Sequence, residues 1–200
     1  MIKTIVFDLG NVLINFDPRV FLRRFKKETG ISYSRVVYYF LYEKGDKEYI
    51  EGKITSEEFF NKLSKDLEFD IPLEVFKDIW NNIFEINPVV EELIIDLKKE
   101  YPVLLLSNIN DWHIEHIQGK YPIMKQFDQL FLSHELKCQK PDPKIYQHVL
   151  DQVASKPEEI FFTDDLKQNI KAAQELGICA RQFTSAENLI NELKKLGVIS

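Results

Sequence analysis

Short apolar segments alternate with segments of helical periodicity after residue 86, and this alternation constrains the fold more than any other feature. Apolar segments of strand length occur at 2–7, 103–106, 130–132, 160–163 and 178–182. Strands separated by helices predict a parallel sheet with both faces covered, because each helix carries the chain back to the same edge. We therefore expect an α/β fold, with helices on both faces of a doubly wound parallel sheet.

Capping residues mark the helices between these strands, with Pro just inside the starts and Gly just past the ends. The signals are Asn87-Pro88, Asp142-Pro143, Gly177, Ser185 and Gly197. The glycine stop at the end of the last helix favours a complete chain.

Between about Asp17 and Phe84 the pattern is helical throughout and holds no convincing strand. The helix signals there are Asp17-Pro18, a stop at Gly30, a capping box from Thr55 to Glu58 and a start at Pro72. We therefore expect a helical cap, residues 15–85, inserted into an α/β core formed by residues 1–14 and 86–200.

Aromatic residues of the expected cap are more typical of a packed core than of a substrate site. They are Phe21, Phe25, Tyr38, Tyr39, Phe40, Phe59 and Phe60. Tyr42, Lys44 and Glu48 are candidates to face a cleft. Trp112, close behind the second core strand, is expected to pack.

Charge and composition exclude several classes of partner. The net charge is −6 and the pI about 5.3, so no basic field would attract nucleic acid or an anionic membrane. The N-terminal apolar run is too short for a signal peptide, and no run reaches transmembrane length. We expect a soluble, cytoplasmic protein, in which Cys138 and Cys179 form no disulfide framework.

Polar side chains follow the strands where a parallel sheet binds ligands, beyond the carboxyl ends. The four groups, in chain order, are Asp8, Ser107-Asn108, Lys140 and Asp164-Asp165. Each one alone has an ordinary structural role, such as a turn acceptor, a helix cap or a surface charge. Their joint occurrence at successive strand ends predicts a site.

Four motifs carry a resemblance to the haloacid dehalogenase superfamily. They are Phe7-Asp8-Leu9-Gly10-Asn11-Val12-Leu13, Leu104-Leu105-Leu106-Ser107-Asn108, Lys140-Pro141-Asp142-Pro143, and Phe162-Thr163-Asp164-Asp165 through Asn169. The match covers essentially the whole chain and is similar to the branch of bacterial α-glucose-1-phosphate phosphatases and of the N-terminal phosphatase domain of soluble epoxide hydrolases.

This resemblance implies a Rossmann-like core and a Mg²⁺-dependent phosphatase acting on small phosphorylated metabolites, with sugar phosphates as the best guess. Asp8 would be the nucleophile and form an aspartyl-phosphate. Mg²⁺ would bind Asp8, the Gly10 carbonyl and Asp165, with Asp164 or Asn169 acting directly or through water. The phosphoryl group would be held by Ser107, Asn108, nearby backbone N–H groups and Lys140, which also has a catalytic role.

One position departs from the family pattern. Most phosphatases of the superfamily carry a second Asp two residues after the nucleophile, as general acid and base, and here that residue is Gly10. Asp17 and His113 are candidate substitutes. Asp17 is equally typical of a helix cap, and His113 of a polar residue at a helix start.

Two other functions remain open. A 2-haloacid dehalogenase would use Asp8 without a metal, although Asp164 and Asp165 would repel its carboxylate substrate. A catalytically weak protein that binds a phosphorylated ligand would explain Gly10. The sequence leaves the particular ester and the oligomeric state undetermined.

Overall fold

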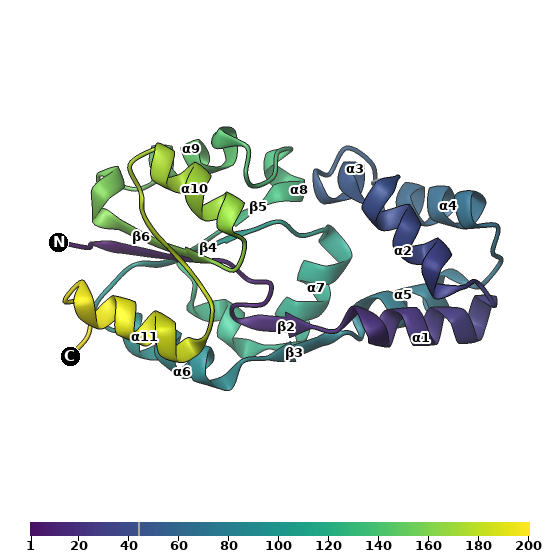
Figure 1. Ribbon diagram of the computed structural model, residues 1–200, viewed down its shortest axis with the longest axis horizontal. Coiled ribbons are helices and arrows are strands. Elements are labelled where there is room, and N and C mark those ends of the chain that lie inside the picture. Colours follow the sequence, from purple (N-terminus) through teal and green to yellow (C-terminus); the bar gives the residue numbers. More distant parts are fainter. Residues whose placement is uncertain (44) are drawn as a thin grey trace.

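The computed structural model describes residues 1–43 and 45–200, and it confirms the expected α/β fold. Within these residues a five-stranded parallel sheet has the order β5-β4-β1-β6-β7. Its strands are β1 (Thr4–Phe7), β4 (Val103–Ser107), β5 (Gln129–Leu132), β6 (Ile160–Asp164) and β7 (Cys179–Gln182). The chain therefore starts in the middle of the sheet and fills first one side and then the other (Figure 1).

Helices cover both faces of this sheet, as the alternation predicts. They are α6 (Pro88–Leu97), α7 (Asp111–Lys120), α8 (Ser133–Leu136), α9 (Pro143–Gln152), α10 (Lys167–Glu175) and α11 (Ala186–Lys195), with short 3₁₀ turns at Pro122–Gln126 and Pro157–Glu159. The predicted caps Asn87, Asp142 and Ser185 each accept a backbone N–H at the helix start.

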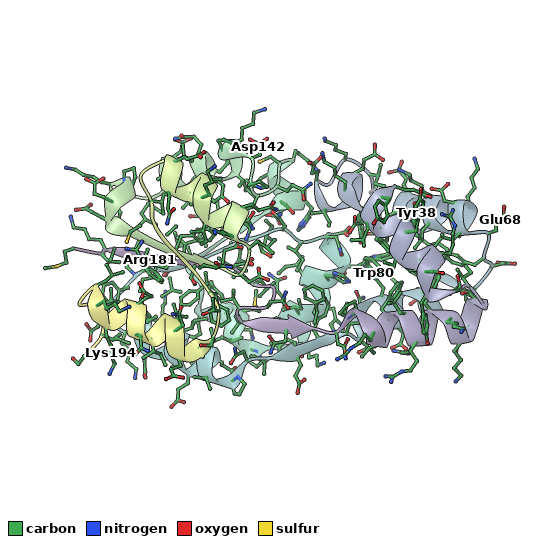
Figure 2. The ribbon with its side chains drawn as sticks, in the orientation of Figure 1. Tyr38, Glu68, Trp80, Asp142, Arg181 and Lys194 are labelled. Atoms are coloured by element: carbon green, nitrogen blue, oxygen red, sulfur yellow. The ribbon has the colours of Figure 1, made fainter. Side chains whose placement is uncertain are left out.

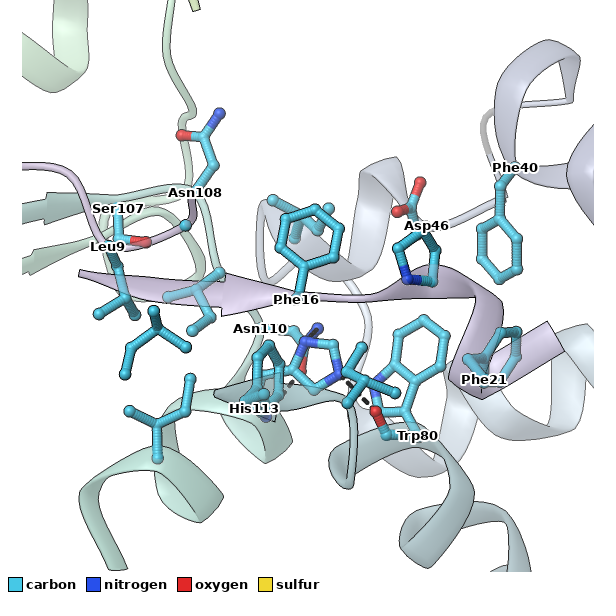
Figure 3. Close-up of a pocket in the computed structure, with 18 of the residues that line it drawn as sticks. Leu9, Phe16, Phe21, Phe40, Asp46, Trp80, Ser107, Asn108, Asn110 and His113 are labelled. Carbon is cyan, nitrogen blue, oxygen red and sulfur yellow. Dashed lines mark hydrogen bonds between the residues drawn. The ribbon is translucent and has the colours of Figure 1, made fainter. Parts of the chain in front are cut away.

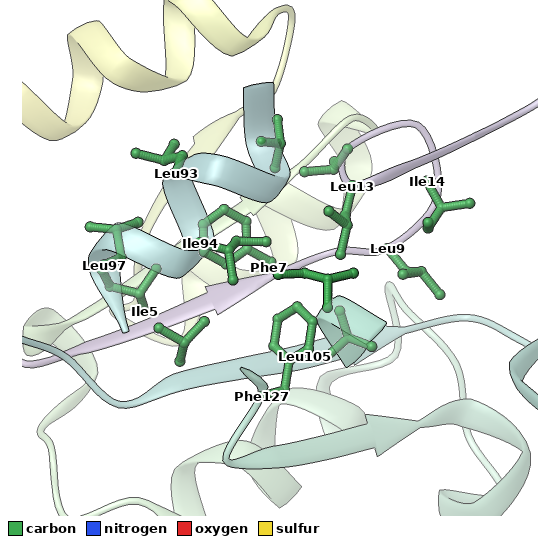
Figure 4. Close-up of a cluster of buried hydrophobic side chains, with 14 of the residues drawn as sticks. Ile5, Phe7, Leu9, Leu13, Ile14, Leu93, Ile94, Leu97, Leu105 and Phe127 are labelled. Atoms are coloured by element: carbon green, nitrogen blue, oxygen red, sulfur yellow. The ribbon is translucent and has the colours of Figure 1, made fainter. Parts of the chain in front are cut away.

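Two apolar clusters lie on the two faces, because side chains alternate along each strand. Ile5, Phe7 and Leu105 pack on one face against α6 (Figure 4). Val6 and Phe162 point to the other face, where α9 and α10 pack. This arrangement fixes the central strand β1 and therefore the position of Asp8 at its end.

The inserted cap consists of α1 (Pro18–Thr29), α2 (Tyr33–Tyr42), α3 (Lys47–Ile50), α4 (Ser56–Leu67) and α5 (Leu73–Asn81). Asp17 caps α1 through Arg19 N, and Gly30 ends that helix in the left-handed conformation at φ 76°. Thr55 and Glu58 form the expected capping box of α4. The cap has its own apolar cluster, which Trp112 of the core joins, so the packing expected of Trp112 is confirmed.

The cap aromatics pack in the cap core as predicted, except Tyr38, although Phe21 and Phe40 also line the pocket described below. Phe21, Phe25, Tyr39 and Phe59 are buried, while Phe40 and Phe60 are half-buried against them. Tyr38 is 51% exposed and lies on the outer side of α2, so its assignment to the core is wrong (Figure 2). It stacks on Tyr42, four residues along the helix, in solvent.

A two-stranded antiparallel ribbon of β2 (Ile14–Phe16) and β3 (Phe84–Ile86) was not predicted. It lies where the chain leaves the core and where it returns, close to the predicted boundaries at 14/15 and 85/86, which stay a prediction. Three residues are too few to show alternation, and Phe84 reads equally well as the end of a helical stretch. No helix in the described residues is both long and apolar enough to span a membrane.

Candidate active site

The nucleophile position Asp8 lies directly beyond the central strand. In the sheet register Phe7 pairs with Leu105 of β4 and with Thr163 of β6. The backbone N–H of Asp8 donates to the Thr163 carbonyl at 2.9 Å. The ends of three neighbouring strands therefore bring Asp8, Ser107 and Asp164 to one edge of the sheet, as expected.

Lys140 is a buried residue of this site and not a surface charge. It belongs to the loop between α8 and α9 and is 3% exposed. Its Nζ lies 2.8 Å from Asp8 Oδ1 and 2.6 Å from Asp164 Oδ2, and it donates to the Leu106 carbonyl at 2.8 Å. All three ammonium protons thus have partners, as a buried lysine requires.

Asn108 and Ser107 differ in what they can offer a ligand. The Asn108 amide is committed to the backbone of Lys140, donating to its carbonyl and accepting from its N–H. Ser107 is 2% exposed at the end of β4, and its hydroxyl makes no hydrogen bond within the described residues. The site places Ser107 Oγ at the pocket wall without a competing partner.

Asp164 and Asp165 are held by two asparagines. Asn169 Nδ2 donates to both oxygens of Asp164, at 2.9 and 3.0 Å, and Leu166 N donates to Oδ1. Asn11 Nδ2 donates to Asp165 Oδ2 at 3.0 Å. Asn169 was expected near the metal, whereas Asn11 was not singled out; its signal is the Gly-Asn turn, since Asn11 adopts φ 55°.

Carboxylate oxygens of Asp8, Asp164 and Asp165 lie within 4.8 Å of one another. Three carboxylates against one ammonium leave excess negative charge, and oxygen donors in this number suit Mg²⁺. The Gly10 carbonyl accepts no hydrogen bond from the described residues, so its lone pairs are available to a cation. The donor set fits the divalent cation that the family resemblance implies.

Burial and the Lys140 ammonium shift the pKa of Asp8 in opposite directions. Burial raises the pKa of Asp8 to about 7, although Lys140 acts in the opposite direction, and Asp164 adds to the rise. Burial lowers the pKa of Lys140, but the two carboxylates outweigh it, so the net shift is upward. Lys140 is therefore a permanent cation, and Asp8 is the group that titrates near neutrality.

Neither substitute for the missing acid is placed to act as one. Asp17 caps α1 and pairs with Arg19, which lowers its pKa. His113 stacks on Trp80, and burial lowers its pKa to about 3, so the ring is neutral. Both ring nitrogens have partners, Asn110 Nδ2 at Nδ1 and the Trp80 carbonyl at Nε2.

A pocket of about 520 Å³ between core and cap opens beside the site. It reaches Leu9, Gly10 and Ser107 and continues to Phe21 and Phe40 of the cap (Figure 3). Tyr42 and Glu48, candidates to face a cleft, are exposed and do not line it, and Glu48 pairs with Lys62. Lys44 lies outside the described residues.

Comparison with known proteins identifies the family. Residues 2–177 match the haloacid dehalogenase-like hydrolase family. The chain belongs to this family, and the resemblance expected from its four motifs is confirmed.

Individual relatives extend this result. The chain is 31% identical to the D-ribitol-5-phosphate phosphatase of Bacteroides thetaiotaomicron, over 88% of this chain and 89% of that one. It is 24% identical to a sesquiterpene phosphatase of Aspergillus oryzae, over 97% and 96%. A haloacid dehalogenase family enzyme from Bacteroides thetaiotaomicron, solved with magnesium and inorganic phosphate, superposes with a TM-score of 0.83 at 31% identity, over 91% and 94%.

Proposed function

We propose that the protein is a Mg²⁺-dependent phosphatase that hydrolyses small phosphate monoesters through an aspartyl-phosphate on Asp8. The observation that carries this proposal is the Asp8 carboxylate, buried at the end of β1 and held through Oδ1 by Leu9 N–H and Lys140, with two more carboxylates beside it. The phosphatase relatives and the magnesium and phosphate complex of a similar enzyme support it.

The residues suggest a two-step reaction. The Asp8 carboxylate attacks phosphorus, the bond from phosphorus to the ester oxygen breaks, and the departing alcohol takes a proton from solvent. Water then attacks the same phosphorus, which releases inorganic phosphate and regenerates Asp8. The Ser107 hydroxyl contacts the phosphoryl oxygens, and the nearby positive charge of Lys140 stabilises the negative charge that moves onto them.

Mg²⁺, when bound by Asp8, Asp164, Asp165 and the Gly10 carbonyl, would screen the negative charge that separates a carboxylate from a phosphate dianion. In this proposal the Asn108 side chain does not bind the phosphate but positions Lys140. Only the backbone N–H of Asn108 is available to the phosphate.

The two other functions fit the site less well. A haloacid substrate would bring its own carboxylate to a site with three acidic residues and one buried lysine. A binding protein would gain little from a nucleophile held in a defined orientation by two partners.

Members of the family act on phosphate esters of different alcohols, so membership does not specify the leaving group. One relative is named for a sugar-alcohol phosphate and another for a sesquiterpene substrate. The expectation of a sugar phosphate, which rests on resemblance, therefore stays a prediction.

The test is phosphate release from p-nitrophenyl phosphate by the wild type and by Asp8→Asn. We expect turnover that is abolished by EDTA, restored by Mg²⁺, and lost in Asp8→Asn. Mass spectrometry of the acid-quenched wild-type reaction should find one added phosphoryl group on the Asp8 peptide. Turnover that persists in EDTA, or activity of Asp8→Asn within tenfold of the wild type, about 1.4 kcal/mol in barrier, would contradict the proposal.

A further inference from the structure

The pocket beside Ser107 is almost entirely apolar beyond its phosphate end. Aliphatic and aromatic side chains from the core, the ribbon and the cap line it: Leu9, Ile14, Phe16, Phe21, Leu22, Val37, Phe40, Leu41, Ile50, Trp80, Ile83, Phe84, Ile109 and Ile117. Its volume of about 520 Å³ lies within the range of sites that enclose small organic ligands.

Polar side chains in the lining are already bonded to one another or to the backbone. Asn108 is committed to Lys140. Asn110 accepts from His113 N and donates to its Nδ1, and His113 Nε2 donates to the Trp80 carbonyl. The hydroxyls of a polyol in this space would lose water and find few partners, which is unfavourable for each buried hydroxyl.

Two other polar groups belong to the lining. Ser107 belongs to the phosphate end, and Asp46 of the cap stands apart from it (Figure 3). Burial raises the pKa of the Asp46 carboxyl, in keeping with the apolar surroundings of that end. Apart from these two and the hydrogen-bonded Asn108, Asn110 and His113, the side chains of the wall are aliphatic or aromatic.

We infer that the preferred substrates are phosphate monoesters of apolar alcohols, whose hydrocarbon chain occupies this pocket while the phosphate lies at Ser107 and Lys140. The inference rests on the proposed function and specifies its substrate class. The outer wall of the pocket supports it, because Val37 and Leu41 of α2 and Phe16 of β2 are exposed and would lose solvent contact against a bound chain.

Burial of each methylene is worth up to about fourfold in binding. In a series of n-alkyl phosphates the acidity of the leaving alcohol is nearly constant, so chain length reports on the pocket alone. We expect kcat/KM to rise by about two- to fourfold per methylene from propyl phosphate and to level off when the pocket is filled, at concentrations below micelle formation.

The decisive pair is pentyl phosphate and ribitol 5-phosphate, which have the same five-carbon chain and differ in four hydroxyls. Neighbouring hydroxyls make the departing alcohol of ribitol more acidic, so chemistry alone would favour ribitol 5-phosphate. We expect pentyl phosphate to be hydrolysed at least tenfold more efficiently, by kcat/KM.

Leu41 gives a variant that is safe for folding, since its side chain is 66% exposed. Leu41→Asn should lower the gain in kcat/KM per methylene along the alkyl series. The matched control is Ile95→Asn, an exposed apolar residue of α6 outside the pocket, which should leave this gain unchanged. Val37→Trp should shorten the chain length at which kcat/KM levels off.

The outcomes separate the two proposals. No turnover of p-nitrophenyl phosphate or any alkyl ester would overturn the phosphatase, and the inference with it. Turnover that is flat with chain length, or higher on ribitol 5-phosphate than on pentyl phosphate, would overturn the inference alone. An equal effect of Leu41→Asn and Ile95→Asn would also contradict it.

Discussion

Asn108 and Lys140 exchange two hydrogen bonds, in which the Asn108 amide accepts from Lys140 N–H at 2.8 Å and donates to the Lys140 carbonyl at 2.9 Å. Asn108, which follows β4, thereby fixes the backbone of Lys140, 32 residues later in the chain. Lys140 Nζ can then reach Asp8 and Asp164 together.

Removing this clamp should impair catalysis through Lys140. Asn108→Ala leaves the Lys140 N–H and carbonyl without partners, which should lower the free energy of unfolding by about 1–3 kcal/mol. Because Lys140 Nζ would then be less well held beside Asp8, we also expect kcat/KM to fall, by about tenfold or more, a barrier change of at least about 1.4 kcal/mol. Asn191→Ala, on the exposed side of α11, is the control and should be neutral. Wild-type kcat/KM in Asn108→Ala would show that Lys140 holds its position without the clamp.

Lys140→Ala should cost more than Ser107→Ala, both in activity and in stability. Removing Lys140 leaves Asp8 and Asp164 buried without their cation, and breaking such a buried pair typically costs about 3–5 kcal/mol. Ser107 loses a neutral hydrogen bond to the substrate only. Urea unfolding and kcat/KM of both variants test this order, and a milder effect of Lys140→Ala on either quantity would contradict it.

The sequence predicted the five strands of the parallel sheet and the helix caps because these signals are local. Asn87, Thr55 and Gly30 lie at helix ends. These residue types are favoured there because the terminal turns of a helix leave backbone N–H and C=O groups without partners. It also predicted which side chains meet, because Asp8, Ser107 and Asp164 follow parallel strands, and the topology alone brings them together.

Contacts between distant segments could not be read in this way. Tyr38 and Tyr39 are neighbours of one residue type, and only the packing of α2 decides that Tyr39 is buried and Tyr38 exposed. Asn11 and Asp165 are 154 residues apart, and nothing in the Gly-Asn turn indicates that the amide points to that carboxylate. The apolar pocket could not be predicted for the same reason, since its wall comes from segments that meet only in the folded chain.

Asp165 should govern the metal requirement, with Asn11 acting through it. Asp165→Ala removes a carboxylate from the cluster, so the Mg²⁺ concentration for half-maximal activity should rise by at least tenfold. Asn11→Ala frees the same carboxylate from its only side-chain donor among the described residues, and a smaller rise of about two- to fivefold is expected. Titration of activity with Mg²⁺ tests both; a larger effect of Asn11→Ala would reverse the assignment.

The affinity for Mg²⁺ should fall as the pH falls below about 7. Burial raises the pKa of Asp8 to about 7 in the metal-free protein, so at lower pH the metal must displace a proton. The apparent dissociation constant should increase by up to tenfold per pH unit below 7 and change little above 8. Calorimetry at pH 6 and pH 8 in buffers of different ionisation enthalpy measures the released proton, which should be absent in Asp8→Asn.

The same shift predicts the stability of the metal-free protein. Folded Asp8 holds its proton more tightly than the unfolded chain, whose ordinary value is near 3.8. Stability should therefore decrease as the pH rises from about 4 to 7, and level off above. The decrease should be smaller in Asp8→Asn; an increase with pH in the wild type that the substitution removes would contradict the raised pKa.

Gly10 sets the last prediction, on how the rate depends on the leaving group. With Asp17 paired to Arg19 and His113 neutral, neither candidate substitute is placed to protonate the departing oxygen. The plot of log kcat/KM against leaving-group pKa should therefore be steep for a series of substituted phenyl phosphates, under conditions where chemistry limits the rate. A Cβ at Gly10 would meet Phe16 at 3.8 Å, an ordinary contact, so the backbone at this position accepts the side chain of Gly10→Asp without a clash at Cβ. Because a general acid contributes about 10²–10⁴-fold, this variant should flatten the slope by accelerating the poorest leaving groups most.

Gly119→Asp, on open surface, is the matched control and should leave the slope unchanged. A shallow slope in the wild type would mean that another acid already performs this role.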